Sequence, residues 1–305
     1  MDANLAQVQD AQRLALAALA DTLVSVTTAE RLAEVSRVSL RSNLSTLDLT
    51  RRRARLGAAS AVDVLRSEQE VASNRSDVVQ ADEGLRRARE ALGMALGFPS
   101  PWGIASGIQV GELAADARAL CSPVASPEDR SDVVAARAQV TVSERAIKSA
   151  SLAYSPTLDL NSDYAYTTSI GSARPSSWQV GALLSVPLYD GGATSASRAA
   201  AQAQAEAAVQ RLSETQRQAH LEVRQSERAV SVARSTYEVS RKARDIARES
   251  ARLSRVAFVH GTGTSFDLVE SARRRRLAEI DLTIQKFEVV RAEITALLAL
   301  SNCSL

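Results

Sequence analysis

The chain has 305 residues, of which 45% are hydrophobic but only 4% aromatic, and its formal net charge is +2. This near-neutral balance argues against a nucleic-acid-binding protein, and two histidines and two cysteines far apart in the sequence cannot form a zinc site. No apolar run approaches the roughly 20 residues of a membrane-spanning helix, and the first residues lack the basic start and apolar core of a secretory signal.

Both ends of the chain are predicted to form long helices. All seven prolines lie in one central window, so residues 1–98 and 188–305 contain none, and proline inside a helix costs about 3 kcal/mol. In the second stretch, apolar residues recur with a period near 3.5, which is typical of a coiled coil. The members of this seam are Val209, Leu212, Ala219, Val223, Val230, Ala233, Tyr237, Ile280, Ile284, Phe287, Ile294 and Leu298. A helix from about Ala193 to Phe258 would be roughly 95 Å long.

Each long stretch is interrupted once, by a similar short segment. In the first, Gly57 suits the left-handed residue that ends a helix. Three residues later, Ser60 can cap the next helix, and Asp63 can reach back to complete a capping box. The second interruption has the same chemistry at Gly261, Thr264 and Asp267. The sequence therefore predicts two helical hairpins with tight turns.

The two interruptions belong to an internal repeat. A constant offset of 204 residues relates Gly57 to Gly261 and Asp63 to Asp267, which indicates a duplicated unit. Under this offset the first repeat would start upstream of Met1, so we expect a chain truncated within that repeat. The predicted organisation is a first-repeat helical hairpin without its β-hairpin, a Pro/Gly connector, a helix that opens the second repeat, a membrane β-hairpin and a second-repeat helical hairpin. Their bounds are 1–98, 99–130, 131–155, 156–190 and 191–302.

The central segment changes to a period of two, which predicts a β-hairpin. Before a turn expected near 171–177, Asp159, Asn161 and Asp163 share the polar face. The residues predicted to share the apolar face are Leu158, Leu160, Tyr164, Tyr166, Trp178, Val180, Ala182, Leu184, Val186 and Leu188. One apolar face with aromatic residues fits a strand pair of an outer-membrane barrel, and a small soluble sheet with one buried face is the alternative. Because open edges are not tolerated in lipid, a barrel would need strands from other copies.

These features together resemble the TolC-type outer membrane factors, the outer membrane efflux protein family. The motifs that carry the resemblance are Tyr154-Ser155-Pro156-Thr157-Leu158 at the start of a strand, Val186-Pro187-Leu188-Tyr189-Asp190-Gly191-Gly192 after one, and Arg130-Ser131-Asp132-Val133-Val134-Ala135-Ala136 at the start of the second half. The two Gly-x-x-Ser/Thr-x-x-Asp turns resemble the family's periplasmic tips. The resemblance covers almost the entire chain.

The resemblance implies a mainly α-helical fold of antiparallel coiled-coil hairpins in tandem, plus two amphipathic strands that contribute to an oligomeric transmembrane β-barrel. It implies a homotrimer in the outer membrane with a periplasmic extension. Such proteins serve as exit ducts of tripartite efflux pumps or type I secretion systems, with a periplasmic adaptor (membrane fusion protein) and an inner-membrane transporter as partners. They are passive conduits, without catalysis, cofactor or metal. The family trimer takes four strands from each subunit, whereas this sequence shows two.

The resemblance also places the candidate site residues. The first group is an acidic ring at the aperture, formed by Asp267 and Glu270, although Asp267 could instead only cap its helix. The periplasmic tip turns comprise Gly57, Ser60, Asp63, Gly261 and Thr264, with Asp63 expected as a cap. The membrane-facing strand residues are Leu158, Leu160, Tyr164, Tyr166, Trp178, Val180, Leu184 and Val186.

Several features have other interpretations at this point. The arginine groups 51–53 and 273–276 are expected to lie on solvated helix faces, with docking of a partner as the alternative. A disulfide between Cys121 and Cys303 is conceivable, but the sequence does not fix their distance. A soluble coiled-coil periplasmic adaptor or scaffold is the competing function. An enzyme is disfavoured, since no motif combines a nucleophile, a base and an orienting group.

Overall fold

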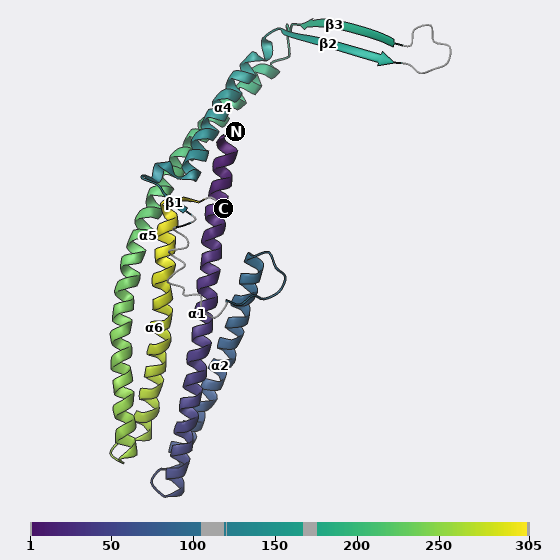
Figure 1. Ribbon diagram of the computed structural model, residues 1–305. Helices are drawn as coiled ribbons and strands as arrows, with labels where there is room; N and C mark the ends of the chain where they lie inside the picture. Colours follow the sequence, from purple (N-terminus) through teal and green to yellow (C-terminus); the bar gives the residue numbers. More distant parts are fainter. Residues whose placement is uncertain (1, 105–118, 120, 167–175, 304–305) are drawn as a thin grey trace. The chain divides into compact units, whose positions relative to one another are not determined.

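The computed structural model describes residues 2–104, 119, 121–166 and 176–303 (Figure 1). It divides into two compact units. The helical unit comprises Gln7–Ser131 and Gln218–Leu305, and the ribbon unit comprises Met1–Ala6 and Asp132–Arg217. Each unit is described by itself below.

The helical unit is built from two helical hairpins. Helices α1 (Asp2–Arg55) and α2 (Ala61–Ala95) form the first, and α5 (Ala193–Val259) and α6 (Ser265–Ala299) form the second (Figure 1). Helix α5 begins in the ribbon unit and is 67 residues long, about 100 Å at 1.5 Å per residue. The predicted helical hairpins and the predicted long helix from Ala193 are therefore confirmed.

Ion pairs tie α1 to α2 along their length. Three antiparallel pairs, Arg51 with Glu68, Arg37 with Asp82 and Glu30 with Arg89, have N–O distances of 2.5 to 2.7 Å. Because these side chains are largely exposed to solvent, each pair contributes at most about 1 kcal/mol. These pairs therefore fix which residues of α1 lie opposite which residues of α2, and they add little to the stability of the hairpin.

The apolar core of the helical unit lies near the C-terminal end of α6. Val24 of α1 packs there with Phe287, Ile294 and Leu298 of α6 and with both cysteines. These three α6 residues are on the seam that the sequence predicts. On α5 the seam is buried at Ala219 and Val223, whereas Val209, which belongs to the ribbon unit, is 48% exposed.

A disulfide between Cys121 and Cys303 closes this core, and it settles what the sequence left open. The cysteines face each other in a short antiparallel pair of strands, β1 (Cys121–Pro123) and β4 (Ser301–Cys303). After a 3-10 turn at Pro127–Asp129, the nearly fully buried Arg130 donates a hydrogen bond to the carbonyl of Ala299 and pairs with Glu222 at 2.8 Å. Residues 121–130 are thereby fixed to the end of α6.

The ribbon unit contains α4 (Ser131–Ser151), a 3-10 turn at Leu152–Tyr154, and the antiparallel strands β2 (Thr157–Tyr166) and β3 (Ser176–Ser185). The predicted β-hairpin is confirmed, with two corrections to its bounds. Val186 lies one residue beyond the end of β3, and Ser176 and Ser177 belong to β3 rather than to the turn. The rest of the predicted turn and its neighbours, 167–175, lie outside the described residues. Among the helices described, none is both long and apolar enough to cross a membrane.

Replacing Cys303 with serine should destabilise the helical unit substantially. The disulfide closes a loop with a sequence separation of 182, and constraining a loop of that length contributes about 5 kcal/mol at most through the unfolded state. The loss should appear as a lower thermal midpoint of the helical circular-dichroism signal. Wild-type protein treated with a reductant is the matched control and should melt with the variant. Equal melting of oxidised wild type and variant would contradict this role.

Candidate functional site

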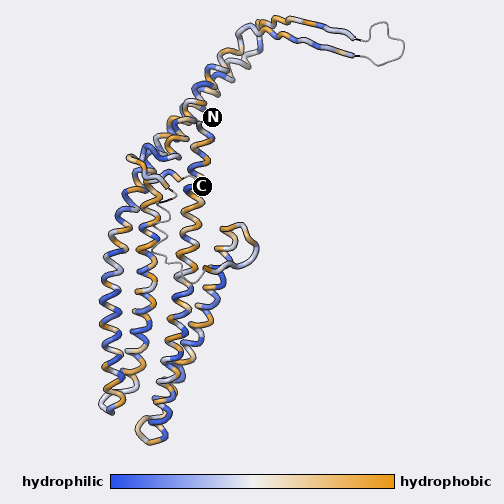
Figure 2. The backbone as a smooth tube through the Cα atoms, in the orientation of Figure 1, coloured by the Kyte–Doolittle hydropathy of each residue, from blue (hydrophilic) through white to orange (hydrophobic). Residues whose placement is uncertain are grey.

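The apolar face of the β2–β3 ribbon is exposed along its whole length. The register places predicted apolar residues directly opposite each other, Leu158 with Leu184 and Tyr164 with Trp178. The seven predicted membrane-facing residues that lie within the strands, Leu158, Leu160, Tyr164, Tyr166, Trp178, Val180 and Leu184, are each 63% to 75% exposed. Figure 2 shows the hydropathy of this ribbon residue by residue. A contiguous exposed apolar surface of this kind indicates contact with lipid or another protein.

One polar pair on that face was not anticipated from the sequence. The indole Nε1–H of Trp178 donates a 2.8 Å hydrogen bond to the hydroxyl of Ser162, which lies opposite Val180. A buried or lipid-facing tryptophan needs such a partner for its N–H group. The period-two pattern contains the signal, because Ser162 is the polar interruption of the apolar face on β2.

The opposite face of the ribbon is mainly polar. Asp159, Asn161 and Asp163 lie on it, paired with Leu183, Gly181 and Gln179. A Cβ atom at Gly181 would come within 2.5 Å of the Asn161 side-chain oxygen, so glycine leaves room for that amide. The ribbon thus separates an apolar face from a polar one, as the alternation predicts.

Asp190 fixes the point where the ribbon returns to helix α5. Its carboxylate accepts hydrogen bonds from the backbone N–H groups of Gly192 and Thr194, at 3.0 and 2.6 Å, which caps the start of α5. It also accepts a 2.7 Å bond from the hydroxyl of Tyr154. The bonds from Thr194, followed by that from Tyr154, hold the pKa of Asp190 well below its usual range. This carboxylate therefore links Tyr154, which precedes β2, to the start of α5, which follows β3.

Both tip turns form the predicted capping boxes. Gly57 and Gly261 have φ angles of 74° and 82°, the left-handed conformation that glycine adopts without strain. Ser60 Oγ accepts from the backbone of Asp63 at 3.2 Å, and Asp63 accepts from the backbone of Ser60 at 2.9 Å. The second turn repeats this reciprocal pair with Thr264 and Asp267. The predicted caps are confirmed.

The tips of the two hairpins are bonded to each other. The hydroxyl of Ser265 donates to Asp63 Oδ1, and Arg66 donates to Ser265 Oγ at 3.2 Å. Arg53 donates to the carbonyl of Phe258 and lies over its ring, 4.4 Å from the centroid. The Ser265 bond is the main cause of the lowered pKa of Asp63. Sequence reasoning found the cap at Asp63 but missed this cross-link, because nothing local shows that the tips meet.

The two acidic residues predicted to form a ring differ in their surroundings. Glu270 accepts hydrogen bonds from Arg273 at 3.0 Å and Arg274 at 2.7 Å, and these bonds lower its pKa to about 2. The carboxylate of Asp267 is bonded to Thr264 of its own cap. The charge of Glu270 is therefore offset by two neighbours within its own helix.

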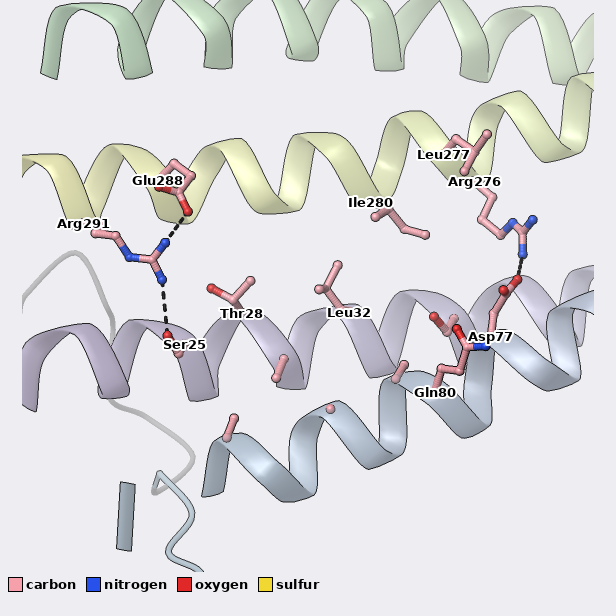
Figure 3. A pocket seen from close by; sticks show the side chains of 15 residues that line it. Ser25, Thr28, Leu32, Asp77, Gln80, Arg276, Leu277, Ile280, Glu288 and Arg291 are labelled. Carbon is pink, nitrogen blue, oxygen red and sulfur yellow. Dashed lines mark hydrogen bonds and ion pairs between the residues drawn. The ribbon is translucent and has the colours of Figure 1, made fainter. Parts of the chain in front are cut away.

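The arginines of the helical unit do not all lie on solvated faces, so that expectation is wrong at Arg276. Its side chain is only 10% exposed and pairs with Asp77 and, at 3.7 Å, with Glu70 of α2. It lines a cavity of about 610 Å³ between α1, α2 and α6, whose wall also includes Arg291 and several alanines (Figure 3). Arg276 thus joins the two hairpins above their tips.

Tandem helical hairpins that carry an exposed amphipathic strand pair define the architecture of TolC-type outer membrane channels. The chain matches the family model described as "Outer membrane efflux protein" over residues 1–98 and 125–299. The chain belongs to the outer membrane efflux protein family. Membership assigns it to efflux at the outer membrane, and it confirms the resemblance inferred from the motifs. Members of this family are channels rather than enzymes.

Solved structures share the fold. A membrane protein from Pseudomonas aeruginosa superimposes with a TM-score of 0.82 at 22% identity, over 98% of this chain and 71% of the other. VceC, an outer membrane protein from Vibrio cholerae, gives 0.78 at 16% identity, over 98% and 72%. The CmeC outer membrane channel of Campylobacter jejuni gives 0.82 at 12% identity, over 98% and 65%. Among curated proteins, none matches the sequence.

Replacing Asp63 with alanine should destabilise the helical unit more than the equivalent change at Asp267. Both changes remove a capping carboxylate, at about 1 kcal/mol each, but only Asp63 also accepts a bond from the other hairpin. The difference should be about 1–2 kcal/mol at neutral pH, measured by thermal or denaturant unfolding. Because the folded-state pKa of Asp63 is lowered from 3.8, this extra stability is present above about pH 4 and is lost as the pH falls further. A difference that persists unchanged in acid would contradict the link.

Proposed function

We propose that this chain is a subunit of a homotrimeric, passive export duct that spans the outer membrane and extends into the periplasm. It serves a tripartite efflux pump or a type I secretion system, together with a periplasmic adaptor and an inner-membrane transporter. It performs no catalysis of its own. The supporting residues lie on the ribbon, at the tips and in the cavity between the hairpins.

The observation that carries this proposal is the exposed ribbon. Each described strand of the ribbon pairs with one neighbour only, so its outer edge leaves backbone groups without partners in the described part of the chain. In lipid, such groups must be satisfied by further strands. Strands from other copies satisfy them when three subunits surround one axis, with the face of Leu160 toward lipid and that of Asn161 toward the lumen. A soluble scaffold would have no use for an apolar face of this extent.

The disulfide supports a periplasmic position for the helical unit. Disulfides form and persist in oxidising compartments such as the bacterial periplasm and are rare in the cytosol. The bond between Cys121 and Cys303 lies in the helical unit beside its apolar core, so that unit is the part of the chain that we assign to the periplasm.

We assign docking of the adaptor to the tip turns and the adjoining cavity. The turns at Gly57, Ser60, Gly261 and Thr264 end the two hairpins at one level, because Asp63 binds Ser265 across them. Above them, the cavity lined by Arg276 and small residues of α2 separates the hairpins. Helical hairpins of a partner fit such grooves by laying an apolar stripe between two helices.

We assign the cation-attracting mouth of the duct to Asp267. Three copies about 6 Å apart would repel pairwise by roughly 1–3 kcal/mol, which favours cations between them. Glu270 lies one turn further along and contributes less, because Arg273 and Arg274 hold its carboxylate. This electrostatic energy is too small to account for gating of the duct by itself. We therefore assign part of the closure to the hydrogen bonds between the tips.

A charged residue on the apolar face should abolish pore formation, whereas the same residue on the polar face should not. Val180→Arg is expected to cost about 2–4 kcal/mol at mid-membrane, and Gln179→Arg, the neighbouring residue on the other face of β3, very little. The measurement is ion conductance of the full-length protein in planar lipid bilayers. Conductance by neither variant nor wild type would contradict the duct. Equal conductance by both variants would contradict the assignment of the faces.

Removing the charge of Asp267 from all three copies should weaken block of the pore by a trivalent cation by at least about tenfold. A trivalent ion about 6 Å from each carboxylate gains roughly 2 kcal/mol per site in water, before screening by salt. The comparison is Asp267→Asn with Asp245→Asn, an exposed residue of α5 about 21 Å from its end by helical rise and beyond the Debye length. Equal block in the two variants would place the mouth elsewhere.

A further inference from the structure

A second cavity of the helical unit is lined mainly by charged side chains. It has a volume of about 370 Å³ and lies between α1, α5 and α6. Its charged lining residues are Arg244 and Arg248 of α5, Arg275, Arg276 and Glu279 of α6, and Glu34 of α1. Arginines outnumber glutamates in this wall, so positive charge is in excess there.

The arginines reach this cavity from two helices at one level. Counted at about 1.5 Å per residue, Arg244 and Arg248 are about 23 and 17 Å from the end of α5 at Val259, and Arg275 is about 15 Å from the start of α6 at Ser265. The two α5 residues are one turn apart and therefore share a face of their helix. Like charges brought together in this way repel each other unless an opposite charge lies between them.

Two of the arginines have acidic partners outside the cavity wall. Arg276 extends from α6 toward α2, where it pairs with Asp77 and, at 3.7 Å, with Glu70 (Figure 3). Arg244 Nε lies 2.9 Å from the carboxylate of Asp245, its neighbour in sequence. The charges of these two side chains are therefore largely offset.

The other two, Arg248 and Arg275, have no acidic partner within the described ranges. Arg275 donates only to the hydroxyl of Ser42, at 3.5 Å, and Arg248 makes neither a hydrogen bond nor an ion pair with a described residue. The Nε–H of the buried Arg276 also lacks a hydrogen-bond partner among those residues. A buried donor without a partner is costly, so this wall has N–H groups to offer to a ligand.

The two glutamates of the wall do not neutralise these donors. Glu34 pairs with Arg31 of its own helix at 2.7 Å. Glu279 is not within ion-pairing distance of any described arginine. The unpaired charges are then two arginines against one glutamate, a balance that favours an anion over a cation.

We propose that this cavity binds a small phosphate-bearing anion, held by Arg248 of α5 and Arg275 of α6. A guanidinium group presents its N–H donors in a planar fork that matches two oxygens of such an anion, and these charge-assisted hydrogen bonds are stronger than neutral ones. Val35 and Val38 of α1 form an apolar part of the same wall, which suits a phosphate monoester with a small organic group.

The bound anion would add a contact that the side chains do not make by themselves. It would join α5 to α6 within the second hairpin, beside α1 of the first. The inference requires only the helical unit, so it does not depend on the proposed duct.

The test is isothermal titration calorimetry of the full-length protein in detergent. Inorganic phosphate and phenyl phosphate are titrated separately at constant ionic strength and about pH 8, where phosphate groups carry close to two charges. We expect saturable binding with a Kd of about 1 mM or lower. Tighter binding of the ester would support the site and extend it to Val35 and Val38, whereas equal binding would support a site for the phosphate group alone. Saturable binding of neither compound would overturn the proposal.

Variants of the two unpaired arginines show whether binding occurs in this cavity. Arg248→Gln and Arg275→Gln should each weaken binding by about tenfold or more, because each removes charge-assisted hydrogen bonds. The matched control is Arg228→Gln, an exposed arginine of α5 about 30 Å from Arg248 by helical rise and beyond the Debye length, which should bind like the wild type.

The helical circular-dichroism signal should be retained in all three variants. Arg248 is exposed, so its variant keeps the test decisive even where Arg275→Gln fails to fold. Binding of equal strength by Arg248→Gln and Arg228→Gln would overturn the proposal, because it would place the anion on the general surface of the protein.

Discussion

The rest of the structure depends on one constraint: the β2–β3 ribbon has an apolar face and outer edges that no other described part of the chain covers. In water the exposed face favours association, and in lipid the unpaired backbone groups at the edges require further strands. In the proposed duct, several copies around one axis meet both requirements, because strands of neighbouring copies would pair with the outer edges while lipid covers the apolar face.

The helical unit is held together by an apolar core and by polar contacts between its helices. The core lies around Phe287 and the disulfide at the end of α6, whereas the exposed ion pairs between α1 and α2, such as Arg37 with Asp82, contribute at most about 1 kcal/mol each. The other fixed point is at the tips, where Ser265 bonds to Asp63. Between these two levels, Arg276 pairs with Asp77 and Arg291 donates to Ser25, so polar contacts also join the hairpins around the cavity.

How much of this could be predicted from the sequence depends on the range of each interaction. Local signals sufficed for the helices, for the capping boxes at Ser60 and Thr264, and for the two faces of the ribbon, because periodicity and turn chemistry act within a few residues. Long-range contacts were not predictable in this way. The disulfide joins residues 182 apart, and the burial of Arg276 depends on α2, which no pattern in its own helix reveals. The end of β3 before Val186 was missed because the alternation continues past the last ladder hydrogen bond.

The duplication explains why the chain contains two similar helical hairpins with different surroundings. Inside the chain, α6 of the second repeat meets α1 of the first near Arg276 and Val35. The equivalent positions on α2 and α5, Ala72 and Val239, are exposed. The two sets of positions differ in chemistry, since the exposed Ala72 corresponds to the buried Arg276. A buried charge is strongly destabilising when its partner is removed, whereas an exposed alanine leaves no charge without a partner. The difference between Arg276 and Ala72 therefore follows from the neighbours that each repeat has within the described part of the chain.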